Sequence, residues 1–151
     1  MASNSDGIVR SESIPYPLAP PQIRWLLARF ITQARSIPAD ARVLSRDFLD
    51  AYHYASGAAL VALNEYARDA APYARMLAQE RNEIEVAHVV ADGDSHFVVG
   101  WTETRYVGDT PVSVEHWRAL LDVGARAAND PEGSGNPFDL YVRNLVWSRE
   151  D

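Results

Sequence analysis

Hydrophobic positions along this chain of 151 residues follow two different periods. In the first half they recur at spacings of three and four, which predicts amphipathic helices over residues 22–35, 39–54, 57–68 and 72–79. From residue 83 onward they alternate, which predicts strands over residues 83–90, 96–107, 112–125 and 140–148. Helices followed by strands favour an α+β domain over alternating βαβ units.

The first predicted helix carries one apolar stripe along its length. A proline-rich segment at residues 15–21 leads into it, and Pro21 suits a first-turn position. Trp25 points away from the apolar stripe. The stripe itself consists of Ile23, Leu26, Leu27, Phe30, Ile31 and Ala34.

Tight turns at residues 92–94 and 108–110 join the first three strands into an antiparallel meander. Alternation places one row of side chains on a single face of each strand. The rows are Ile84, Val86, His88 and Val90; Phe97, Val99, Trp101, Glu103 and Arg105; Trp117, Ala119, Leu121 and Val123; and Tyr141, Leu145 and Trp147. A long meander curls. By analogy of fold, three to four N-terminal helices packed on a curved four-stranded antiparallel sheet resemble the nuclear-transport-factor-two-like cone.

Composition narrows the class of protein. Hydrophobic residues make up 47% of the chain, which is typical of a globular domain. The formal net charge is −7, so we expect the protein to repel nucleic acid. Cysteine is absent, which excludes disulfides and thiolate chemistry. No run of 18 apolar residues occurs. We expect residues 1–20 to form an extended or disordered lead-in and residues 21–151 to form a single domain.

Catalytic and metal-binding patterns are weak. The four histidines show no metal-ligand spacing, although His88 and His116 lie on strands that could be neighbours. Ser113 and His116 fall on opposite sides of a strand, so a triad is not expected. An acid–base site inside the cone is the enzymatic alternative. Its candidates are Tyr52, Asp47, His88, Glu103 and His116. We expect Glu103 and Arg105 instead to face water or to form cross-strand pairs.

Aromatic residues beside arginines are the remaining unusual feature. Arg24, Trp25 and Arg29 lie on the first helix, and Trp and Arg are enriched at the centres of protein interfaces. Packing of Trp25 beneath the proline-rich segment is the structural alternative. No catalytic residue, cofactor or metal ligand is predicted.

Four stretches in this order resemble the TrbF proteins of conjugation systems, relatives of the eighth VirB component of type IV secretion. They are RWLLARFITQARSIPAD at 24–40, ALNEYAR at 62–68, VGWTETRY at 99–106 and NPFDLYVRNLVWSRE at 136–150. In the C-terminal signature Asn136 and Pro137 match, whereas Asp139 stands where the family has glycine. Only glycine enters positive φ freely, so a contact that the family makes through the backbone of that glycine is weakly supported for Asp139 in this chain.

The resemblance implies a non-enzymatic assembly component of a conjugation channel, on the periplasmic side of the bacterial inner membrane. It implies other secretion subunits or a second copy as partners, with no cofactor and no direct nucleic-acid contact. A transmembrane anchor would precede the domain and is absent here, so the chain is expected to be a truncated form. The predicted interface is Arg24, Trp25, Arg29, Asn136, Pro137 and Asp139. An isomerase or dehydratase, or a ligand-binding module, of the same fold are the alternatives.

Overall fold

The computed structural model describes residues 18–125 and 140–150. Four helices come first in the chain and four strands follow. The helices are α1 (Pro21–Arg35), α2 (Ala41–His53), α3 (Ala58–Ala70) and α4 (Pro72–Leu77). The strands are β1 (Glu80–Ala91), β2 (His96–Val107), β3 (Thr110–Ala125) and β4 (Leu140–Glu150).

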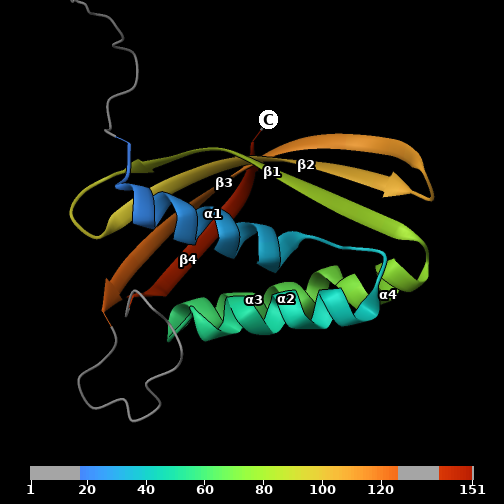
Figure 1. Ribbon diagram of the computed structural model, residues 1–151, viewed down its shortest axis with the longest axis horizontal. Helices are drawn as coiled ribbons and strands as arrows, with labels where there is room; N and C mark the ends of the chain where they lie inside the picture. Colours follow the sequence, from blue (N-terminus) through green and yellow to red (C-terminus); the bar gives the residue numbers. More distant parts are fainter. Residues whose placement is uncertain (1–17, 126–139, 151) are drawn as a thin grey trace, which may run out of the picture.

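The strands form one antiparallel sheet in the order β1-β2-β3-β4. Figure 1 shows the sheet curving over the helices, which all lie on its concave side. Helix α1 packs against β1 and α2, and α3 packs against β4. The predicted α+β architecture, in which helices pack on the concave side of a curved antiparallel meander, is confirmed. The first strand begins three residues earlier than predicted, at Glu80.

The apolar core lies between helices α1, α2 and α3 and the sheet. Apart from the half-buried Ile23, the predicted stripe of α1 is buried, with Leu27 and Ile31 fully covered, while Trp25 is 51% exposed. Phe97, Val99, Leu121 and Val123 meet it from β2 and β3. Removing the apolar surface of these side chains from water is the main favourable contribution to folding.

A β-bulge changes which residues of β1 face the core. The register with β2 shifts between Val86 and His88, so the alternation changes side at that point. His88 is exposed and its ring lies over Gly100, whereas Val89 is buried in the core. The prediction that His88 shares the inner face with Ile84 and Val86 is therefore wrong.

A second bulge acts in the same way on β4. The register with β3 shifts between Asp122 and Val123, and Val142 becomes fully buried in the core. Tyr141, which was predicted to share a face with Leu145 and Trp147, is buried outside that cluster. Strict alternation fails at both places because a bulge inserts one residue into the pairing.

Connecting segments cover parts of both edges of the sheet. Ile37, just after α1, exchanges two backbone hydrogen bonds with Asn82 of β1, and the Ala19 N–H donates to the Val89 carbonyl. On the other edge Val142 of β4 bonds to Tyr54 and Ser56 between α2 and α3. These bonds fix the helices against the sheet and satisfy backbone groups that an open edge would expose.

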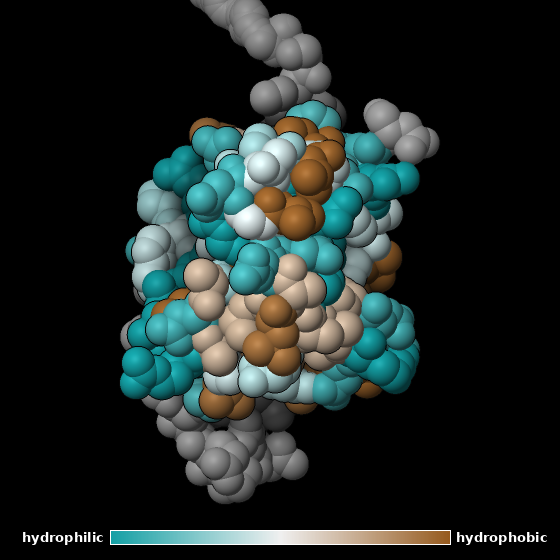
Figure 2. All heavy atoms as spheres, turned by 90° about the vertical axis from the view of Figure 1, so that its right-hand side faces the viewer, coloured by the Kyte–Doolittle hydropathy of each residue, from teal (hydrophilic) through white to brown (hydrophobic). Residues whose placement is uncertain are grey.

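The end of the molecule that carries α4 and the β2–β3 turn exposes apolar side chains. Figure 2 shows two apolar areas on this face with a hydrophilic band between them. Tyr73 and Leu77 of α4 are 54% and 64% exposed, and Val107 and Val112 near the turn are 46% and 45% exposed. No helix among the described residues is long and apolar enough to cross a membrane.

Candidate functional site

A buried ion pair lies on the concave side of the sheet. Arg35, the last residue of α1, is 4% exposed, and its Nε donates to a carboxylate oxygen of Glu103 on β2, which is 6% exposed. The basic residue also suits the negative end of the helix dipole. A pair buried in this way needs further polar partners, because both groups have lost their hydration.

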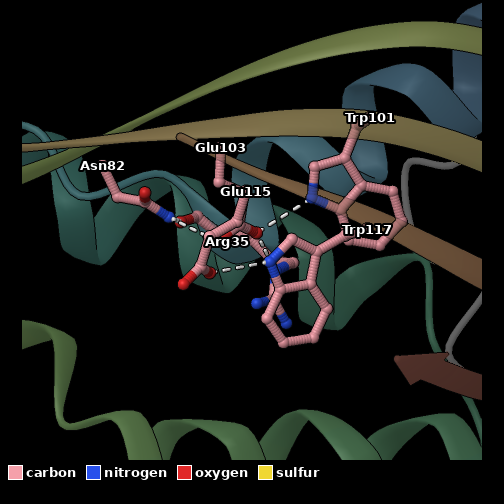
Figure 3. Close-up of polar contacts among 6 residues, drawn as sticks. All are labelled: Arg35, Asn82, Trp101, Glu103, Glu115 and Trp117. Atoms are coloured by element: carbon pink, nitrogen blue, oxygen red, sulfur yellow. Dashed lines mark hydrogen bonds and ion pairs between the residues drawn. The ribbon is translucent and has the colours of Figure 1, made fainter. Parts of the chain in front are cut away.

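Those partners come from neighbouring elements (Figure 3). The Trp101 Nε1–H donates to the same Glu103 oxygen as Arg35, at 2.9 Å, and the Asn82 amide donates to the other, at 3.1 Å. The same Asn82 nitrogen also lies 3.0 Å from the Arg35 carbonyl oxygen. Both oxygens of the carboxylate are thus satisfied, as a buried charge requires.

Four aromatic rings surround the Arg35 guanidinium. Its central carbon lies 4.1 Å from the centroid of Trp117 and 4.6 Å from that of Trp147. Tyr66 and Trp101 lie at 4.7 Å and 5.6 Å. A desolvated cation is attracted by the negative faces of such rings. We call Arg35, Glu103 and the four rings the arginine cluster.

An open cleft of about 990 Å³ borders the arginine cluster, between α3, α4 and the sheet. Three arginines and five carboxylates line it, for a formal net charge of 3 − 5 = −2. The lining charges are Arg35, Arg75, Arg105, Glu65, Asp69, Glu80, Glu103 and Glu115. Burial, aided by the Glu103 charge, raises the pKa of Tyr66 although Arg35 acts in the opposite direction. Tyr66 therefore stays neutral near pH 7, and its ring forms part of the wall of the cleft.

Glu115 of β3 stands at the border of the same cleft. It accepts hydrogen bonds from Trp117 Nε1 and from Arg149, both at 3.1 Å. Burial raises the pKa of this carboxyl, but the two hydrogen bonds outweigh it, so the pKa lies below its ordinary value. The carboxylate thereby holds the Trp117 ring that covers Arg35.

The predicted interface residues of α1 border a different surface. Arg29 stands over the Trp25 ring at 5.4 Å and lies 3.9 Å from Asp50 of α2. A shallow groove of about 610 Å³ runs here between α1 and α2. It also contains Gln33, whose buried Oε1 has no hydrogen-bond partner among the described residues. Arg24 is half-buried on the same helix. The other three predicted interface residues, Asn136, Pro137 and Asp139, lie outside the described residues.

The five acid–base candidates do not form one site. Glu103 lines the cleft, whereas Asp47 lines the groove between α1 and α2, where burial raises its pKa. Tyr52 packs edge-on against Phe48 at 5.1 Å. His88 and His116 lie on β1 and β3, which could have been neighbours but are separated by β2.

The expectation for Glu103 was also wrong. Its side chain is buried and does not face water, because Arg35 at the end of α1 pairs with it. Arg105 does behave as predicted, since it lies 3.5 Å from Glu80 on the neighbouring strand. The sequence did contain a signal for this burial. Glu103 continues the row of Phe97, Val99 and Trp101, and a carboxylate on such an apolar face is buried only with a cation beside it.

A family model described as VirB8 protein matches residues 2–150. The chain belongs to the VirB8 family, whose members are components of type IV secretion systems. The predicted relation to the eighth VirB component is confirmed. No curated protein sequence matches the chain.

Solved structures of the same fold are distant in sequence. The soluble domain of TrwG from Bartonella grahamii superimposes with a TM-score of 0.71 at 13% identity, covering 88% of this chain and 96% of that one. VirB8 from Agrobacterium tumefaciens gives 0.64 at 15% identity, with 83% and 88% covered. TraE in complex with 2-(2-furyl)isonicotinic acid gives 0.68 at 13% identity, with 87% and 98% covered. At these identities the similarity establishes the fold.

Proposed function

We propose that this VirB8-family chain is a non-enzymatic assembly component of a bacterial conjugation channel. Residues 21–151 would form one domain on the periplasmic side of the inner membrane and contact other channel subunits or a second copy. The outer face of α1, with Arg24, Trp25 and Arg29, is the proposed contact surface, together with the turn at residues 136–139. The net charge of −7 favours protein partners over nucleic acid.

One observation carries this proposal. On a helix whose inner side is almost fully buried, Trp25 remains 51% exposed and lies under the guanidinium of Arg29. Tryptophan and arginine dominate the energetic centres of protein interfaces. The charged groups beside them, Asp47, Asp50 and Arg46, give the rim that such a centre needs.

The enzymatic alternative has less support. An acid–base site needs titratable groups that converge in an enclosed apolar cavity. The cleft here is open and heavily charged. Its buried carboxylate, Glu103, already accepts hydrogen bonds from Arg35, Trp101 and Asn82. We therefore assign Glu103 to the fold.

The test replaces Trp25 in the full-length protein, in a strain that lacks the native gene. We expect Trp25→Ala to lower conjugation frequency and the recovery of channel subunits with the protein, at an unchanged level of folded protein. Val61→Ala is the matched control, because Val61 is 55% exposed on α3, away from this surface. Equal behaviour of the two variants would remove α1 as the contact surface. Full conjugation in the absence of the protein would remove the assembly role itself.

A further inference from the structure

The arginine cluster leaves part of the Arg35 guanidinium available to a ligand. Its Nε is engaged by Glu103, and no hydrogen bond to the two terminal nitrogens occurs among the described residues. Figure 3 shows these nitrogens pointing away from Glu103 and Trp101, and Arg35 contributes to the lining of the cleft. A residue that is only 4% exposed thus turns its remaining donors toward the cleft.

The shape of those donors selects the ligand group. The two terminal nitrogens of a guanidinium form a planar fork that fits both oxygens of a carboxylate. The fork is held in place, since Glu103 fixes one edge and the rings of Trp117 and Trp147 lie within 4.6 Å of the central carbon. Little side-chain freedom remains to be lost when a carboxylate binds.

The rest of the cleft restricts what can carry that carboxylate. Glu65 and Asp69 of α3 and Glu115 of β3 line the cleft and make its net charge negative, which disfavours phosphate and other compact polyanions. The same carboxylates favour a cationic group placed next to the bound carboxylate. Ala62, Leu145 and Trp147 provide apolar wall for an uncharged part of the ligand.

We propose that the cleft beside Arg35 is a peptide-binding site for a free carboxylate with a basic side chain next to it, such as a chain terminus that ends in lysine. The terminal nitrogens of Arg35 receive the carboxylate, and Glu65 and Asp69 receive the cation. This site is distinct from the α1 surface of the proposed function, so each of the two proposals can fail without the other.

Hippuryl-lysine, which joins a benzoyl ring, a carboxylate and an ammonium group, is a suitable probe. Titration into the ¹⁵N-labelled protein should shift the assigned indole N–H signals of Trp117 and Trp147. We expect the C-terminal amide of the probe to bind about tenfold more weakly or worse, because it cannot accept two charged hydrogen bonds. Hippurate, which lacks the ammonium group, should also bind more weakly. Equal affinity for the amide would overturn the assignment of Arg35.

Variants then locate the site. Glu65→Gln with Asp69→Asn changes two residues on one side of α3, and it should weaken binding of hippuryl-lysine without weakening that of hippurate. Arg35→Met combined with Glu103→Gln removes both buried charges and should abolish binding of either probe. Arg29→Met, the same substitution on the outer side of α1, is the control and should bind both probes normally. Retained binding by the Arg35 variant, or lost binding by the control, would refute the site.

Discussion

Helix α1 carries two arginine–tryptophan pairings that differ in almost everything except residue type. Arg35 is 4% exposed and lies within 5.6 Å of four aromatic ring centroids, with Glu103 as its ion-pair partner. The Arg29 side chain is 47% exposed, stands over Trp25 and lies 3.9 Å from Asp50. The two arginines are six residues apart on one helix.

The difference shows that burial decides what such a pairing does. Around Arg35 the buried carboxylate is committed to the fold: Glu103 offsets the buried charge through the Nε of Arg35, and Asn82 and Trp101 satisfy Glu103. Around Arg29 water screens the charges, so the contact contributes little to stability and its side chains stay accessible to a partner. The inner pairing therefore holds the end of α1 on the sheet, and the outer one presents a surface.

The largest effect is expected when Glu103 loses its charge. Glu103→Gln keeps the shape and the acceptor for Trp101 but leaves the Arg35 cation buried without a counter-ion. We expect a loss of about 3 kcal/mol in the free energy of unfolding, measured by urea denaturation. Asp50→Asn removes the corresponding partner of Arg29 and should cost less than about 1 kcal/mol. Similar losses in the two variants would break the comparison.

Removing both buried charges should cost less than removing one. In the Arg35→Met, Glu103→Gln double variant no unpaired charge remains, and the methionine fills much of the arginine volume among the rings. We expect it to be at least about 1 kcal/mol more stable than Glu103→Gln alone. A double-mutant cycle with Arg35→Met measures this coupling. Additive losses would mean that the two side chains do not act as a pair.

The aromatic partners should follow the same division. Trp147→Leu removes a ring 4.6 Å from Arg35 that also meets Tyr66 edge-on at 5.4 Å. We expect a loss of about 2 kcal/mol in unfolding free energy, because the cation–π contact is desolvated. Trp25→Leu, on the outer side, should cost less than about 1 kcal/mol. The reverse order would assign the structural role to the outer pairing.

The sequence predicts the order of the elements, the faces of α1 and the inner rows of β2 and β3, because these depend on periodic burial over ten or more residues. It fails at His88 and Tyr141, where a bulge reverses the alternation, since one added residue leaves no hydrophobic signature. It also fails for Glu103, whose partner Arg35 is 68 residues away. Local pattern identifies an inward charge, but only the packed fold supplies its partner.

The smallest effect concerns Glu115, at the border of the arginine cluster. Burial raises the pKa of this carboxyl, but hydrogen bonds from Trp117 and Arg149 bring it below the ordinary value of 4.5. The folded protein therefore binds fewer protons at this site than the unfolded chain, so its stabilisation is present above about pH 5 and is lost as the pH falls further. In urea unfolding, the difference between wild type and Glu115→Gln should be constant near neutral pH and shrink in acid. A difference that stays constant in acid would show that Glu115 contributes no charge to holding Trp117 over Arg35.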